Sequence, residues 1–554
     1  MDPLRKDLEG DQEFVVRDDA DATTLAKHNL TGEIVHHLKK ANDGHTILIP
    51  QPTDDPRDPL NWRPWKKWAV LLSISVASIL PDYGSGTGAV TIIPQGYDWN
   101  LHPDYVNHSQ AGNIIMIGAG GLFAVIMSNA YGRWPTIFWM LCFSVIFAVL
   151  AAAAPNFNTF MTARILQGFF SAPAQATGLM FVKDMHFFHE QVRRVNLWTS
   201  FFILSPYLGP IVSAAILSHD SGNVTDLTVT SIELWHWAFG QLAILSGVAL
   251  LGIVVFADET WYNRAVPADL QPPLGNRFAR ITGFGRPEYR TTYTLRQSAI
   301  RLTVLITKIP IFVVCISYGL SFAWVVGIAT VLPVSLVPPP LKGYGFGDEQ
   351  IALFWFTPVV AVVIGEAIGH VLNYRIQLWY INKRGVLVPE NRLWINWLAL
   401  PLMVAGLLII GFALEHHYHD MLISLGWGMY AGGIMIATTG YYQYCLDCYP
   451  TEAGEVAAWL NFFRTMGGFI ISYEMIDFVA DKGALKAFGI LAGLTGAAFL
   501  GVPILQIFGH RFRKIAGPVP QAVPGRSPRF QGSVEQKVPE IREPDYNYEP
   551  EEVK

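Results

Sequence analysis

Long apolar blocks separated by short polar stretches dominate the chain. Each block is close to 20 residues long, the length that an α-helix rising about 1.5 Å per residue needs to cross roughly 30 Å of hydrocarbon. The blocks therefore predict an all-α membrane protein with twelve transmembrane helices. The predicted spans are 67–94, 110–130, 136–154, 159–182, 195–217, 235–257, 309–335, 350–374, 393–413, 421–446, 456–478 and 486–509.

A polar stretch near the middle divides these spans into two sets of six. The predicted organisation is an N-terminal tail (1–62), a six-helix half (63–257), a central loop (258–307), a second six-helix half (308–510) and a C-terminal tail (511–554). Lys and Arg gather in alternate loops, in the central loop and beside both tails. Such loops face the cytoplasm, so both termini are predicted to be cytoplasmic. No cleavable signal peptide is expected before the first span, and the plasma membrane is the expected location.

Composition agrees with a membrane protein. The chain is 51% hydrophobic and 15% charged, whereas soluble domains carry about 25% charged residues. A formal charge of −5 gives no reason to expect nucleic acid as a partner. The expected partners are the lipid bilayer, a small-molecule substrate and protons, and the protein is expected to be a monomer. No catalytic, P-loop or metal-ligand pattern stands out, so no enzyme activity, cofactor or metal is predicted.

Two asparagines lie in sequons within the loops opposite the basic ones. These are Asn107-His108-Ser109 and Asn223-Val224-Thr225. Both are predicted glycosylation sites.

Ionisable groups at membrane depth are costly unless they face a partner or a watery cavity, so they are the first functional candidates. Asp82 lies near the middle of the first span and is followed by Tyr83 and a Gly-rich run. One hypothesis puts Asp82 in a central cavity, where it binds a proton or a cationic substrate. The alternative is that Pro81 and Asp82 begin a break in the helix, and the carboxylate serves only freed backbone groups.

Two more charged residues lie deep in the second half. Glu366 lies in the eighth span with His370 one turn later. It is either a proton-binding carboxylate or a residue at the inner end of the span that pairs with Arg375 or with a neighbouring helix. Arg464 lies about 15 Å into the eleventh span and must be paired if it is buried. Glu366 or Asp447 is the expected partner.

Further candidates line the spans without a defined partner. Arg164 and Gln167 share one face of the fourth span. Tyr318, Trp324 and Tyr441 lie inside spans, where their rings can face lipid or stack on a substrate.

Several motifs resemble those of the major facilitator superfamily over residues 55–514. Gly132-Arg133 lies in the second-to-third loop, with Asn129 where the family motif has Asp, and Arg164-Ile165-Leu166-Gln167-Gly168 resembles the fourth-helix motif assigned to proton coupling. Other segments resemble a fungal group of drug/proton antiporter relatives that includes the yeast histidinol and polyamine permease. They are Asp55-Pro56-x-Asp58-Pro59-x-Asn61-Trp62, Glu259-Thr260, Pro389-Glu390-Asn391-Arg392-Leu393, Asp447-x-Tyr449-Pro450 and Glu455-Val456 with Asn461 and Arg464.

The resemblance implies a secondary active transporter whose two halves rock around a central site. A surplus of cavity acids would favour organic cations or drug-like compounds, with proton coupling through Asp82 and Glu366. Export of a fungal secondary metabolite and a transport-inactive membrane receptor are the alternatives. The resemblance implies loop roles in gating for Asn129, Gly132, Arg133 and Asp447.

Overall fold

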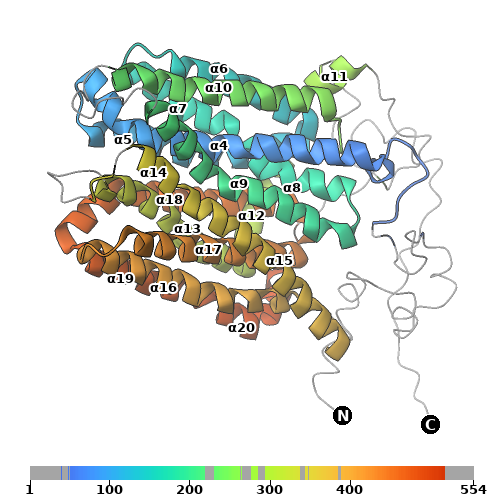
Figure 1. The fold of residues 1–554 in the computed structure, drawn as a ribbon. Coiled ribbons are helices and arrows are strands. Elements are labelled where there is room, and N and C mark those ends of the chain that lie inside the picture. Colours follow the sequence, from blue (N-terminus) through green and yellow to red (C-terminus); the bar gives the residue numbers. More distant parts are fainter. Residues whose placement is uncertain are drawn as a thin grey trace, which may run out of the picture.

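A computed structural model provides the coordinates (Figure 1). It describes residues 39, 48, 50–218, 230–262, 264, 276–284, 293–336, 344–346, 348–384, 388–517 and 519. Every regular element within these ranges is a helix, as the sequence predicts.

The first half of the bundle contains seven long or medium helices, two of which form one broken span. Pro64 at the first helical position starts α4, where its missing N–H costs no hydrogen bond. The bounds are α4 Pro64–Trp99, α5 Pro103–Tyr131, α6 Arg133–Ala152, α7 Phe157–Ser171, α8 Pro173–Met185, α9 Phe188–Ser218 and α10 Thr230–Phe256.

In the second half, the predicted eighth span is interrupted at Trp355 and the predicted twelfth span at Leu500. Its helices are α13 Ile309–Leu336, α14 Asp348–Phe354, α15 Phe356–Arg384, α16 Asn396–Glu415, α17 Asp420–Cys448, α18 Ala453–Lys482, α19 Ala484–Phe499 and α20 Gly501–Ala516. The described residues include three short 3-10 helices, η2 Pro59–Asn61, η5 Pro389–Ile395 and η6 Pro450–Glu452.

Ten helices in the described part of the chain are long and apolar enough to cross a membrane. Of the other two predicted spans, 159–182 is divided into α7 and α8 at Pro173, and 456–478 is α18, which carries Asn461 and Arg464 in its middle. The predicted eighth span, 350–374, is interrupted at Trp355 between α14 and α15. The first span has no break, because α4 continues without interruption through Pro81. The helix-break alternative for Asp82 is therefore wrong.

The two halves lie side by side in Figure 1, with α4–α10 above and α13–α20 below. Helix α5 packs along α18, α8 also contacts α18, and α9 contacts α14 and α15. We call the end of the bundle that carries Arg133, Lys183, Arg301 and Arg513 the basic end. The other end, where α4 finishes at Trp99, is the opposite end.

The predicted central loop contains two helices, α11 Arg277–Thr282 and α12 Leu295–Ile306. A capping box between Thr294 and Gln297 starts α12. Helix α12 then contacts α5 of the first half and α18 of the second. Arg301 forms ion pairs with Glu452 at 3.3 Å and Glu455 at 3.4 Å. Helix α12 is thus attached to both halves at the basic end.

The polar segment before α4 is docked on the basic end of the first half. Asp58 caps η2 through the backbone N–H of Leu60 and pairs with Arg264 at 2.9 Å. Asp55 pairs with Arg57 at 2.7 Å and accepts a hydrogen bond from Tyr262 at 3.1 Å. The acidic residues of the Asp-Pro-x-Asp-Pro motif therefore fasten the chain before the first span to the loop after α10.

Candidate functional site

A small cavity of about 40 Å³ lies between the two halves. Pockets for drug-sized ligands measure about 300–1,000 Å³, so the halves must separate before such a molecule can enter. Helices α4, α5 and α9 supply one wall, and α13, α18 and Trp355 supply the other. The lining residues are Asp82, Ser85, Gly86, Ala89, Gln110, Ile114, Pro206, Phe322, Val325, Val326, Ala329, Trp355, Arg464 and Thr465.

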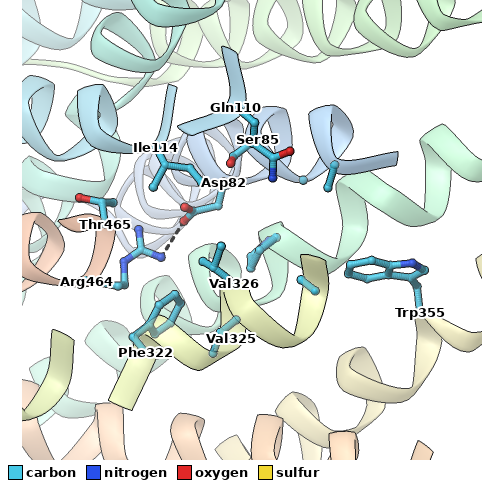
Figure 2. A pocket seen from close by; sticks show the side chains of 14 residues that line it. Asp82, Ser85, Gln110, Ile114, Phe322, Val325, Val326, Trp355, Arg464 and Thr465 are labelled. Atoms are coloured by element: carbon cyan, nitrogen blue, oxygen red, sulfur yellow. Dashed lines mark ion pairs between the residues drawn. The ribbon is translucent and has the colours of Figure 1, made fainter. Parts of the chain in front are cut away.

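An ion pair between the halves forms the polar side of this cavity. Arg464 Nη1 of α18 lies 2.9 Å from Asp82 Oδ2 of α4. A dashed line marks this ion pair in Figure 2. Both side chains are buried, with whole-residue exposures of 1% and 8%. Arg464 was expected to pair with Glu366 or Asp447, and that expectation is wrong. Helix α4 and helix α18 come from different halves, and sequence spacing carries no information about their contact.

Two amide side chains complete the environment of the ion pair. Gln175 Nε2 donates to Asp82 Oδ2 at 2.7 Å, and Gln175 Oε1 accepts from Arg464 Nη2 at 3.1 Å. Asn461 Oδ1 accepts from Arg464 Nη2 at 2.7 Å. The guanidinium also lies 4.7 Å from the ring of Phe322. Sequence reasoning missed Gln175, because an amide inside a span is not unusual by itself.

Arg164 and Gln167 lie behind the cavity, within the first half. Arg164 Nη1 donates to the Gly84 carbonyl at 2.8 Å, and its guanidinium lies 4.9 Å from the Phe239 ring. Gln167 Oε1 accepts from Asn113 Nδ2 at 3.0 Å. Neither residue lines the cavity in this conformation.

Tyr83 faces away from the cavity as well. Its hydroxyl donates to Gln241 of α10, and its ring belongs to an apolar cluster of the first half. Asp82 therefore lines the cavity, whereas the neighbouring Tyr83 packs inside the first half.

The predicted aromatic residues are buried in the second half. Tyr318 lies next to Phe322, and its ring centroid is 6.0 Å from that of Tyr441. The indole N–H of Trp324 has no hydrogen-bond partner among the residues that the structure describes. None of the three predicted residues lines the cavity.

A second aromatic group, missed from the sequence, lies at the far side of the cavity. Trp355 lines the cavity and lies 5.0 Å from Trp427 between ring centroids. Tyr207 of the first half contacts both, at 6.5 Å and 6.1 Å. These three rings meet across the interface between the halves.

Glu366 lies outside the cavity, on the face of α15 that packs against α9. Its carboxylate is close to Ser200, and one turn later His370 Nδ1 lies 3.3 Å from Asn196 Nδ2. Asp82 and Glu366, the two predicted proton sites, are therefore not brought together in one site.

The predicted loop residues lie at the basic end. Asn129 Nδ2 donates to Glu455 Oε1 at 3.0 Å, which joins α5 to α18 across the halves. Arg133 Nε lies 2.7 Å from Asp184 Oδ2. Asp447 pairs with Arg392 at 2.7 Å, within the second half.

Gly132 has a positive φ of 106° next to the Glu259 carboxylate. Glu259 accepts from the backbone N–H groups of Arg133 and Trp134 at 3.1 Å and 3.2 Å. A Cβ at Gly132 would lie 2.6 Å from Glu259 Oε2. Burial raises the pKa of Glu259, and the charge of Arg133 and these N–H groups oppose that shift.

Asn107 does not lie on a free loop. It is in α5, and its Nδ2 donates to the Ser472 carbonyl of α18 at 3.0 Å. Asn223 lies outside the described residues. In the described part of the chain no cluster of His, Cys, Asp and Glu could hold a metal ion.

Comparison with known proteins agrees with this architecture. The chain is 24% identical over 467 residues to the efflux pump radE of Floropilus chiversii, covering 83% of each chain. It is 23% identical to the MFS-type transporter hepF of Aspergillus oryzae, covering 76% of this chain and 84% of that one. The partially occluded, inward-open xylose transporter XylE of E. coli superposes with a TM-score of 0.53 at 14% identity, covering 80% of this chain and 99% of XylE. The model of the Major Facilitator Superfamily matches residues 74–472, and the chain therefore belongs to that superfamily.

Proposed function

We propose that the protein is a proton-coupled secondary transporter that moves small organic molecules by alternating access. The observation that carries the proposal is the Asp82–Arg464 ion pair, which joins the two halves at the central cavity. Family membership favours transport over catalysis. Both termini are proposed to be cytoplasmic and the protein to be a monomer of the plasma membrane, within the fungal drug/proton antiporter-like group.

The ion pair gives a physical reason for coupling. A carboxylate that loses its buried partner is costly to keep charged, so separation of Asp82 from Arg464 favours proton uptake by Asp82. Asp82 deprotonates again when the pair reforms. Rocking of the halves and proton binding are then linked through one contact.

Contacts at both ends of the bundle are consistent with a closed state. Asn129 joins Glu455 at the basic end, and Asn107 joins the Ser472 carbonyl at the opposite end. Alternating access requires each set of contacts to break in turn. Asn129 stands where the family motif has Asp, which could favour a receptor that has lost transport. Because this side chain still links the halves through Glu455, its presence does not support the receptor alternative.

The relative radE is named an efflux pump, so export is kept as the alternative direction to proton-coupled uptake. A secondary metabolite or a drug-like compound remains the proposed cargo. Glu366 is proposed as a second proton site, distinct from the cavity.

Transport in proteoliposomes tests the proposal. With an imposed pH gradient, proteoliposomes that contain the wild type should accumulate more of a small organic ligand that binds the protein than protein-free liposomes do. Asp82→Asn should lose gradient-driven accumulation and retain exchange of labelled for unlabelled substrate. Asp420→Asn is the control, since Asp420 is the first residue of α17 and pairs with the adjacent N-cap residue His419. Full gradient-driven accumulation by Asp82→Asn would remove Asp82 from the coupling mechanism.

A further inference from the structure

Two buried guanidinium groups and one carboxylate lie in or directly behind the wall of the central cavity. Asp82 and Arg464 line it. Arg164 is fully buried behind Gly88, where a Cβ would lie 2.4 Å from Arg164 Nη2 and 3.8 Å from Oε1 of Gln110, a residue that lines the cavity. The charges in the described part of this region therefore sum to +1.

Arg164 is not neutralised by a neighbour. Among the described residues no carboxylate pairs with it, and its Nε and Nη2 have no hydrogen-bond partner. Its contacts are the Gly84 carbonyl and the Phe239 ring. A buried charge without a counter-ion is costly, so Arg164 gives the cavity a positive potential that favours an anion.

The carboxylate of Asp82 is already occupied. It holds Arg464 at 2.9 Å and accepts from Gln175 at 2.7 Å. A cationic substrate would have to displace a guanidinium that Gln175 and Asn461 also hold. It would leave Arg464 and Arg164 both without a carboxylate. The preference for cations required a surplus of acids, and the described cavity has none.

An organic anion, in contrast to a cation, can take the place of the Asp82 carboxylate on Arg464. When Asp82 takes a proton from water, its neutral carboxyl group releases Arg464, and the substrate anion can replace the carboxylate at the guanidinium. Arg464 then keeps an anionic partner, whereas a cationic substrate would leave it without one. Arg464 of α18 is the charged group that faces Asp82, Tyr318 of α13 is a titratable group that interacts with both, and α8 presents the amide of Gln175.

The rest of the cavity wall is suited to an apolar ring. Phe322, Val325 and Ile114 surround the guanidinium end, and Trp355 closes the far end (Figure 2). Aromatic rings stack favourably on such side chains.

We infer that the central site takes an aromatic organic anion, such as a carboxylate, whose acidic group pairs with Arg464 in place of Asp82. This inference rests on the proposed transport function and names its substrate class. Proton binding to Asp82 and anion binding to Arg464 favour one another, and such coupling is reciprocal. The affinity for the anion therefore rises as the pH falls.

Binding of two probes matched in size and opposite in charge tests the inference. Purified full-length protein in lipid nanodiscs is titrated with 2-naphthoate and with 2-naphthylmethylammonium, without a pH gradient. The wild type should bind the carboxylate and not the amine. Asp82→Asn, which removes the competing carboxylate, should bind 2-naphthoate about tenfold more tightly, and Arg464→Gln about tenfold more weakly, in line with a charge-assisted hydrogen bond. Asp420→Asn should match the wild type.

Several results would overturn the inference. The first is that the wild type binds the amine and that Asp82→Asn abolishes this binding. The others are that the wild type binds both probes equally well, or that it binds neither probe. The wild-type comparison stands even if Arg464→Gln fails to fold. Binding of 2-naphthoate without gradient-driven flux would support the anion site and contradict the proposed proton coupling. Gradient-driven accumulation of the amine alone would support proton coupling and contradict the anion site.

Discussion

The guanidinium of Arg464 and the carboxylate of Asp82 meet at 2.9 Å in the interface between the two halves. Gln175 contacts both groups, so the pair is held by three helices, α4, α8 and α18. Any motion that separates the halves must exchange these contacts for others. The state of this pair thus reports the state of the whole bundle.

The first prediction concerns the energy of this pair. Asp82→Asn and Arg464→Gln each leave a buried partner uncompensated, and breaking a buried pair costs about 3–5 kcal/mol. The double variant should lose much less than the sum of the single losses. Unfolding of the detergent-solubilised variants measures this coupling in a double-mutant cycle. Additive losses would mean that the two side chains do not interact.

The second prediction concerns the turn before α6. Gly132→Ala puts a Cβ at φ 106° and 2.6 Å from Glu259 Oε2. Backbone strain of this kind costs about 1–3 kcal/mol, so the midpoint of thermal unfolding should fall. Gly489→Ala is the matched control, because no atom lies within 4 Å of its new Cβ. An equal response of the two variants would contradict the local geometry.

The third prediction concerns the contact between the halves at the basic end. Asn129→Asp puts a second carboxylate beside Glu455, where the Asn129 amide now donates at 3.0 Å. Repulsion between like charges should shift the population towards a bundle that is open at this end. Spin labels at Arg63 and Lys383, both exposed, should report a longer mean distance. Asn158→Asp, at the exposed start of α7, should leave the distance unchanged, and no lengthening in Asn129→Asp would reject the role of this contact.

The fourth prediction concerns pH and the segment before α4. The Arg57 guanidinium holds the pKa of Asp55 below its ordinary value of 3.8. The folded pKa is the lower one, so the contribution of Asp55 to docking is complete above pH 3.8 and is lost as the pH falls through the folded pKa. Since Arg57 is partly exposed, the contribution is at most about 1 kcal/mol.

Hydrogen exchange of residues 51–62, corrected for the intrinsic effect of pH, measures this contribution. Protection in the wild type should decline on acidification. In Asp55→Asn, protection from exchange should be lower than in the wild type at neutral pH and should change little on acidification. A wild type with constant protection down to pH 3 would contradict the assignment.

The helices and the division into halves were predictable, because each span corresponds to one continuous stretch of sequence whose length and apolar character indicate a membrane helix. The candidate site was predictable only in part. Asp82 and Arg464 stood out because charge at membrane depth is costly, whereas their pairing depends on which helices meet. Gln175 and Trp355 became visible only in three dimensions, because an amide or an indole inside a span is not unusual by itself. Glu366 stood out for the same reason as Asp82, yet its helix turns it towards α9.

The central claim is that Asp82 exchanges its ion pair with Arg464 for a proton when substrate binds. Infrared difference spectra of the reconstituted protein, recorded on addition of 2-naphthoate, test it most directly. A protonated carboxyl band should appear in the wild type and in Asp420→Asn, and it should be absent in Asp82→Asn. Ligand binding without such a band in the wild type would contradict the claim.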